Sequence, residues 1–227
     1  MVFLTKKYLF LQKKYVMETV KKIPFDLVEI AKAFNIKQNR NSKHLNEWLT
    51  AQYTFNEIEQ SILDNTFERI TIAGNYWNEE ELRVRVIGSL FYVADIEKPD
   101  DICLFYERPL SATINNHYLS VVCDCFVASS IFNAPVHPYF FLQELKKAKG
   151  EKKDPEAQML TAMIIAQHLN NDNKPIYGGY LIGTNWWFST LVGNQYCLSR
   201  QFALSQKDDF EKTASILRKL KELILNR

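Results

Sequence analysis

Three ionisable residues in apolar segments have types and spacing that could do chemistry. Asp124 interrupts the run LSVVCDCFVAS, and Glu144 and Lys146 lie in FFLQELKKA, residues 140–148. Successive side chains of a strand point to opposite faces, so Glu144 and Lys146 would share a face with Leu142. A carboxylate among apolar side chains is costly unless it is paired, hydrogen-bonded or bound to a metal ion. The three residues therefore need a joint explanation, either an ion-pair cluster that closes the end of a sheet or a metal site.

The segments around these residues predict a hairpin followed by a further strand. Pro109 indicates an edge or a bulge in the first strand, and Asn115-Asn116 is typical of a tight turn. Pro135 and Pro138 indicate an irregular segment before the strand that carries Glu144. We expect strands at 102–115, 117–128 and 140–148, and a loop at 129–138.

A helix is expected before the first strand, in the sequence NEEELRVRVIGSLF. Asn78 is a good N-cap, and Glu81 stands where the acid of a capping box belongs. Helical spacing places Glu79 on the same face as Leu82 and Val86. We therefore prefer Glu79 to Glu80 as an acid that faces the sheet, while the alternative is that all three acids only favour the start of the helix.

A second helix is expected after the third strand, with Asp154 as N-cap and Pro155 at its first position. Its apolar face contains Gln158, followed at helical spacing by Ala162 and Ile165. The buried amide of Gln158 needs hydrogen-bond partners. Two interpretations stay open: a core glutamine bonded to the backbone of the sheet, or a residue of a functional site.

This order of features resembles the PD-(D/E)XK nuclease superfamily, and is similar to the nuclease domains of type I restriction subunits. The resemblance rests on Asp124, on the Glu-x-Lys pattern of Glu144 and Lys146, on the helix with Gln158, and on the preceding helix with Glu79. It implies a restriction-endonuclease-like α/β (α+β) core, with a central mixed β-sheet flanked by helices. One departure is that Cys123, where many members have proline, directly precedes Asp124.

The resemblance also implies an activity, the metal-assisted hydrolysis of phosphodiester bonds in nucleic acid, with DNA as the first candidate. Asp124 and Glu144 would hold Mg²⁺ or Mn²⁺, with Glu79 as a further ligand, and Lys146 would orient the attacking water. Gln158 would lie near the site. Hard oxygen ligands suit these ions better than zinc. The alternatives are a catalytically degenerate nuclease-like domain that binds DNA or a protein, and an interaction module that works through its N-terminal helices.

The chain as a whole is predicted to divide into two regions. Residues 1–73 are expected to form an N-terminal helical region, and 74–227 the nuclease-like domain. Aromatic residues of the later strands would form either core or a platform for stacked bases; they are Trp186, Trp187, Phe188 and Tyr196. We expect helices at 8–22, 25–34, 44–51, 56–70 and 207–227, a loop at 37–43, strands at 176–183, 186–192 and 195–204, and turns at Thr184-Asn185 and Gly193-Asn194.

Composition sets outer limits. The 227 residues are 47% hydrophobic and 24% charged, enough for a proper core, and the net charge of +2 does not argue for nucleic acid. The four cysteines and four histidines lack zinc-site spacing, so we expect free thiols. No apolar run suits a signal peptide or a membrane helix, and cytoplasmic localisation without membrane contact follows as an expectation. Lysines after Glu144 form either a solvated turn or a phosphate-contacting patch; they are Lys146, Lys147, Lys149, Lys152 and Lys153.

Overall fold

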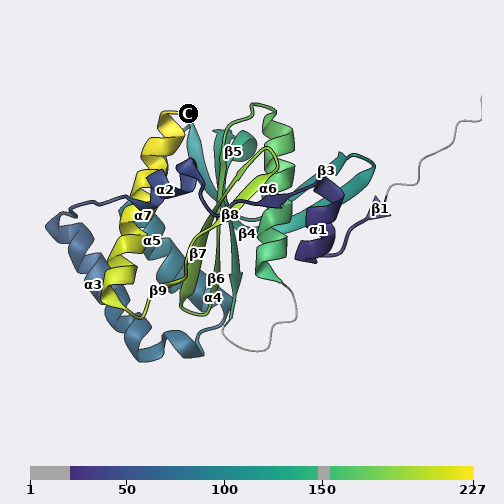
Figure 1. The fold of residues 1–227 in the computed structure, drawn as a ribbon. Coiled ribbons are helices and arrows are strands. Elements are labelled where there is room, and N and C mark those ends of the chain that lie inside the picture. The colour runs from purple at the N-terminus through teal and green to yellow at the C-terminus, as the bar shows by residue number, and fades with distance from the viewer. Residues whose placement is uncertain (1–20, 148–153) are drawn as a thin grey trace, which may run out of the picture.

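A mixed β-sheet lies between two layers of helices in the computed structural model of this chain (Figure 1). The structure describes residues 21–147 and 154–227. Within these ranges the strands are β1 (Lys21–Lys22), β2 (Lys37–Gln38), β3 (Ile102–Ile114), β4 (His117–Ile131), β5 (Ala134–Lys146), β6 (Ile176–Ile182), β7 (Asn185–Val192), β8 (Gln195–Leu198) and β9 (Phe202–Ala203). The prediction of a mixed α/β fold with a mixed central sheet flanked by helices is confirmed.

The helices of the described ranges follow in chain order. They are α1 (Leu27–Phe34), α2 (Lys43–Leu49), α3 (Glu57–Ala73), a 3₁₀ turn (Gly74–Tyr76), α4 (Glu79–Leu82), a π-helical turn (Arg83–Ile87), α5 (Gly88–Ala94), α6 (Pro155–Asn170) and α7 (Lys207–Leu225). In this part of the chain no helix has both the length and the apolar character needed to cross a membrane.

The sheet combines two antiparallel parts through one parallel pair. Strands β3, β4 and β5 pair antiparallel in sequence, and β6, β7 and β8 do the same. Between the two parts β5 pairs parallel with β6, and α6 makes the connection. The short strands β1 and β2 pair parallel with β4 and β8, and β9 pairs with β7.

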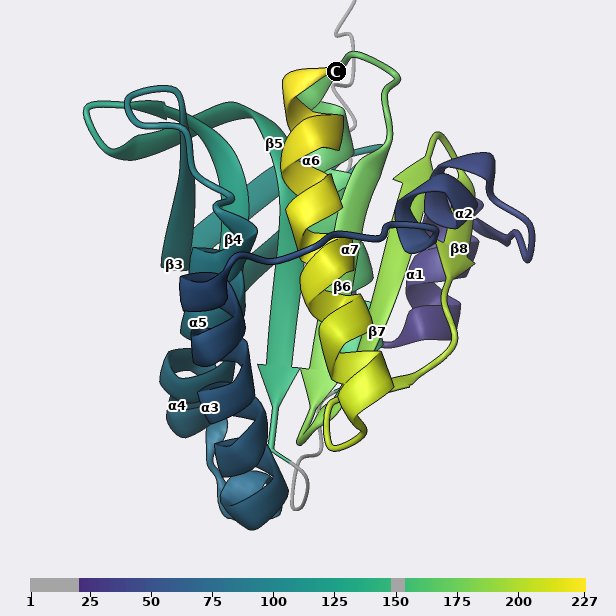
Figure 2. The ribbon, with the colours of Figure 1, turned by 90° about the vertical axis from the view of Figure 1, so that its left-hand side faces the viewer.

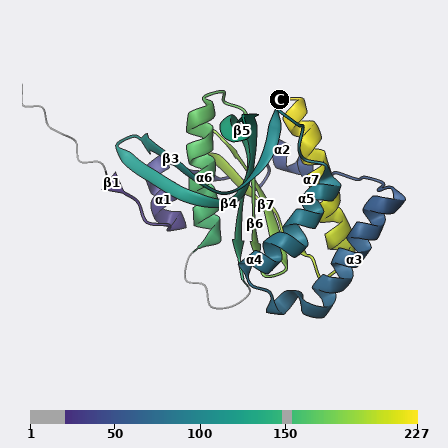
Figure 3. The same ribbon diagram turned by 180° about the vertical axis from the view of Figure 1, so that it is seen from behind.

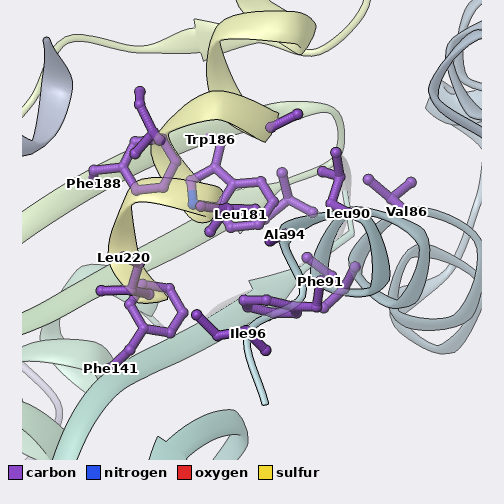
Figure 4. Packing of buried hydrophobic residues seen from close by; sticks show 14 of the residues in the cluster. Val86, Leu90, Phe91, Ala94, Ile96, Phe141, Leu181, Trp186, Phe188 and Leu220 are labelled. Carbon is purple, nitrogen blue, oxygen red and sulfur yellow. The ribbon is translucent and has the colours of Figure 1, made fainter. Parts of the chain in front are cut away.

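Each face of the sheet has its own hydrophobic core. Helices α2, α3, α5 and α7 cover one face, where Trp48 makes edge-on contacts with Phe141, Tyr177 and Phe188. Figure 4 shows side chains from α5, β5, β6, β7 and α7 gathered in this core. Helices α1 and α6 cover the opposite face, and Figure 1 shows α7 and α6 on the two sides of the sheet. Figure 2 looks onto the face that α7 covers. Strand β5 therefore carries core residues on both faces, Phe141 toward one and Leu142 toward the other.

Several local predictions are confirmed. Asn115 and Asn116 form the turn between β3 and β4, both with positive φ, and Gly193 and Asn194 join β7 to β8. Asp154 caps α6 by accepting hydrogen bonds from the backbone N–H groups of Glu156 and Ala157.

The predicted loop at 129–138 is wrong. Strand β4 continues to Ile131 and β5 begins at Ala134, so only a two-residue turn, Phe132-Asn133, separates them. Both turn residues have positive φ, 50° and 57°, which suits the twist of a tight hairpin. Pro135 and Pro138 are tolerated because the β5–β6 ladder begins only at Phe141. On the side of β5 that faces β6, the residues before Phe141 therefore need few N–H donors.

Other boundaries also differ from the predictions. Lys37 and Gln38, expected in a loop, form β2, because their backbone pairs with β8. Residues 195–204 form two strands rather than one, since the chain leaves the ladder around Ser199, whose hydroxyl binds the backbone of Phe188. Of the helix predicted at 8–22, only Lys21 and Lys22 are described, and they are the strand β1. The rest of that prediction, and the end of the strand predicted at 140–148, lie outside the described residues.

Candidate active site

Asp124 lies where β4 and β5 separate. The ladder between the two strands ends at the pair Cys125–Gln143, and Asp124, the residue that precedes Cys125 on β4, is the first one outside it. Beyond that pair the two strands are joined through the Asp124 side chain, whose Oδ2 accepts a 2.6 Å hydrogen bond from the backbone N–H of Leu145. This side-chain bond ties the two strands at their fork. It also commits one carboxylate oxygen and leaves Oδ1 for other partners.

Glu144 and Lys146 form a buried ion pair on β5. The Lys146 Nζ lies 2.9 Å from the Glu144 Oε1, and the two residues are 3% and 7% exposed. Lys146 also donates to the carbonyl oxygen of Leu145 at 2.7 Å. The predicted alternation along β5 holds for the neighbouring residues, since Leu142 packs in the α6-side core and Leu145 in the opposite one.

The start of α4 brings Glu79 to the same ammonium group. Its Oε1 lies 3.7 Å from the Lys146 Nζ, and its side chain is one-third exposed. Asn78 and Glu81 form the predicted capping box, and Glu80 points to solvent with Arg83 as its partner. Figure 3 shows α4 beside one end of the sheet. Of the three acids, Glu79 is thus the one that the structure places at Lys146, on the helix face that the spacing indicated.

The structure adds Arg83 and Glu107 to the charged cluster of Asp124, Glu144, Lys146 and Glu79. No sequence pattern indicated either residue. The Arg83 Nη2 lies 3.5 Å from the Asp124 Oδ1 and also pairs with Glu107, while Nη1 pairs with Glu80 at 2.8 Å. Glu107 is the residue at which the β3–β4 register skips, opposite Asp124, and its φ is +49°. Pro109 had indicated an irregularity in this strand. No sequence signal identified the irregular residue as an acid facing Asp124.

Gln158 is buried in α6, 6% exposed, as its place on the apolar face predicted. Its Oε1 has no hydrogen-bond partner within the described ranges, where neither a hydrogen bond nor an ion pair joins Gln158 to Asp124, Glu144 or Lys146. The structure therefore places this glutamine in the interior without linking it to the charged cluster.

Burial and neighbouring charges set the protonation of the cluster. Burial raises the pKa of Asp124 despite the Leu145 hydrogen bond and the nearby cations. Burial and the charge of Asp124 raise the pKa of Glu144 to about 8. For Lys146, burial opposes the charged form, but the attraction of Glu144 and the other acids outweighs it and raises the pKa. Lys146 therefore remains an ammonium group at neutral pH.

The aromatic residues of the later strands are mostly core. Trp186, Phe188 and Tyr196 are buried, whereas Trp187 is partly exposed and stacks on Tyr180 with the ring centroids 4.9 Å apart. Of the lysines after Glu144, only Lys146 and Lys147 belong to the described residues. The four cysteines are free thiols, as predicted, and burial raises the pKa of Cys123 and Cys125.

Oxygen donors dominate the cluster, but they are not assembled as a preformed metal site. Within residues 21–147 and 154–227 no group of three or more His, Cys, Asp or Glu side chains is arranged to hold a metal ion. The acids instead converge on two nitrogen cations, Lys146 and Arg83.

Comparisons with known proteins give no further identification. No family model matches the chain, and none of the curated proteins matches it.

Proposed function

We propose that this protein is a metal-dependent nuclease that hydrolyses phosphodiester bonds in nucleic acid, with DNA as the first candidate substrate. The observation that carries the proposal is the meeting of Asp124, Glu144 and Lys146 at the fork of two neighbouring strands, with Glu79 added from the preceding helix. The order of elements, a helix, the antiparallel strands β3 to β5, helix α6 and the parallel strand β6, supports the interpretation as a restriction-endonuclease-like core.

The donor chemistry of the cluster fits Mg²⁺ or Mn²⁺. These ions prefer carboxylate oxygens, and the residues that would hold one are Asp124 through its Oδ1, Glu144, and Glu79. The paired set contains more carboxylates than cations, since Lys146 and Arg83 between them pair with five acids. When bound, the ion would stabilise developing negative charge and lower the pKa of a water molecule.

The protein's own residues would supply orientation and charge. The hydrogen bond from the Leu145 N–H fixes the Asp124 carboxylate, so the position of Oδ1 is set by the backbone of β5. Lys146, which stays protonated, would donate a hydrogen bond to the attacking water rather than accept its proton. Glu144 must lose its proton to act as a ligand, and its burial beside Asp124, which raises its pKa, opposes that loss in the metal-free protein.

A second candidate function is a nuclease-like domain that binds DNA or a protein without cutting. One observation favours it: both cations of the cluster already pair with the acids, as they would in a purely structural charge network. The two candidates differ in whether a divalent cation replaces these pairs.

Cleavage assays decide between the two candidates. Labelled single- and double-stranded DNA and RNA would be incubated with Mn²⁺ or Mg²⁺ and with the wild type, Asp124→Asn or Lys146→Ala. Asp101→Asn serves as a matched control, because Asp101 is an exposed acid paired with Lys98 away from the cluster. Metal-dependent cleavage that both site variants lose and the control keeps would support the nuclease. Binding without cleavage, unchanged in the site variants, would favour the non-catalytic domain.

A further inference from the structure

The Arg83 guanidinium lies beside Asp124, on the side of the carboxylate oxygen that the Leu145 N–H does not bind. Asp124 Oδ2 is committed to the Leu145 N–H, so Oδ1 is the oxygen available to a cation. The Arg83 Nη2 lies 3.5 Å from Oδ1 and pairs at the same time with Glu107. The guanidinium nitrogen therefore sits between carboxylates that come from two different strands.

The main chain is irregular on all three elements that meet at this guanidinium. The π-helical turn between α4 and α5 begins at Arg83 itself. Glu107 has a left-handed backbone on β3, and the β4–β5 ladder stops next to Asp124. In a regular helix and regular strands, the side chains of Arg83, Glu107 and Asp124 would point in other directions than they do here. The irregularities accompany the close approach of Arg83 to both acids.

The guanidinium also has donor capacity beyond its present pairs. Arg83 is held by Glu80 through Nη1 and by Glu107 through Nη2, and its side chain is 15% exposed. The buried Nε has no hydrogen-bond partner among the described residues. A guanidinium offers its donors in a planar fork that matches two oxygens of a phosphate group.

We propose that Arg83 is an exchangeable counter-ion of the active site. Its guanidinium and a divalent cation compete for Asp124 Oδ1, and the guanidinium that the cation displaces binds a backbone phosphate of the nucleic acid. Glu80 and Glu107 keep the displaced group beside the site. This inference rests on the proposed nuclease function and adds a phosphate-binding residue to it.

Mn²⁺ titration without nucleic acid tests the competition. Calorimetry would compare the wild type with Arg83→Ala, Arg83→Lys and Asp124→Asn. Arg85→Ala is the matched control, because Arg85 lies on the same turn but pairs with Glu81 and lies over the ring of Trp77. Removing the competing charge should tighten Mn²⁺ binding by about tenfold in Arg83→Ala. Arg83→Lys, which keeps a cation, should stay within about threefold of the wild type.

A second measurement tests the phosphate contact. At saturating Mn²⁺, Arg83→Ala should bind a short DNA duplex more weakly and cleave it more slowly than the wild type, with partial recovery in Arg83→Lys. A residue that only stabilised the fold would not combine tighter metal binding with weaker DNA binding. Circular dichroism and melting temperature would establish that each variant is folded.

The outcomes separate two kinds of failure. If Mn²⁺ binding depends on Asp124 but is equal or weaker in Arg83→Ala, the counter-ion inference is wrong and the proposed function stands. If neither the wild type nor Arg83→Ala binds Mn²⁺ in a way that needs Asp124, the proposed nuclease function itself is contradicted. Unchanged DNA binding in Arg83→Ala would overturn the phosphate contact.

Discussion

Phe141 and Glu144 lie on the same strand and are buried to nearly the same degree, 0% and 3% exposed, yet their surroundings are opposite. Phe141 packs against aromatic rings of α2 and α5, in an apolar core whose central side chain is Trp48. Glu144 lies near the end of β5 beside Lys146, in a charged cluster that also contains Asp124 of β4 and Arg83 of the π-helical turn.

The two regions are stabilised in different ways. Apolar burial is favourable in itself, so the core around Trp48 needs only good packing. Buried charges lose their hydration, and only ion pairs and hydrogen bonds compensate for that loss. An ion-pair cluster therefore contributes little stability, or even lowers it, compared with apolar residues. Stability alone therefore does not account for the charged cluster.

The largest expected effect is in the aromatic core. Trp48→Ala removes a ring that contacts Phe141, Tyr177 and Phe188, together with its 2.7 Å hydrogen bond to the Ile216 carbonyl oxygen. The free energy of unfolding should fall by about 3–5 kcal/mol, measured by urea denaturation. A loss below about 1 kcal/mol would show that this region is not the central core.

Replacing the charges at the C-terminal end of β5 should affect stability in a different way: removing one charge should cost more than removing both. Lys146→Ala leaves the buried Glu144 without its ion-pair partner and should lower the free energy of unfolding by about 3 kcal/mol. The double variant Glu144→Leu with Lys146→Met removes both charges and should regain most of that loss, or exceed the wild type. Both values come from urea denaturation. A double variant less stable than Lys146→Ala would mean that the pair itself stabilises the fold.

The pH dependence of stability separates the regions in a different way. The pKa of Glu144 is raised from 4.5 to about 8, so between these values the folded protein holds a proton that the unfolded chain releases. Stability should therefore fall as the pH rises through this window. In Glu144→Gln this contribution is absent, and its melting temperature should fall by several degrees less between pH 5 and about 8.5. Trp48→Ala is the control and should keep the wild-type slope.

The smallest effect on stability is expected at the rim of the charged cluster. Glu79 is one-third exposed and 3.7 Å from Lys146, so Glu79→Gln should change the free energy of unfolding by less than about 0.5 kcal/mol. As a ligand in the proposed site, Glu79 should nevertheless matter for Mn²⁺, and calorimetry should show weaker binding. Unchanged Mn²⁺ affinity would remove Glu79 from the ligand set.

The sequence by itself determined the local elements and the residues that need special partners. Periodicity and capping residues predicted α6 with Gln158 on its buried side, and the capping box of Asn78 and Glu81 predicted the start of α4. The turn residues at Asn115-Asn116 and Gly193-Asn194 predicted two hairpins. Asp124, Glu144 and Lys146 were recognisable because ionised groups in apolar strands cannot remain unpartnered. These signals are local, and a short stretch of chain carries each of them.

Only the tertiary structure decided which distant groups meet. Prolines in 129–138 suggested a loop. A proline is tolerated there because the first half of β5 has β4 as a neighbour on one side and does not pair with β6 on the other, and this depends on the strand order of the whole sheet. Likewise no sequence pattern relates Arg83 or Glu107 to Asp124. A π-helical turn and a left-handed residue bring them to Asp124, and both depend on how the helix and β3 pack against the fork of β4 and β5. Long-range packing sets these directions, so no local pattern records them.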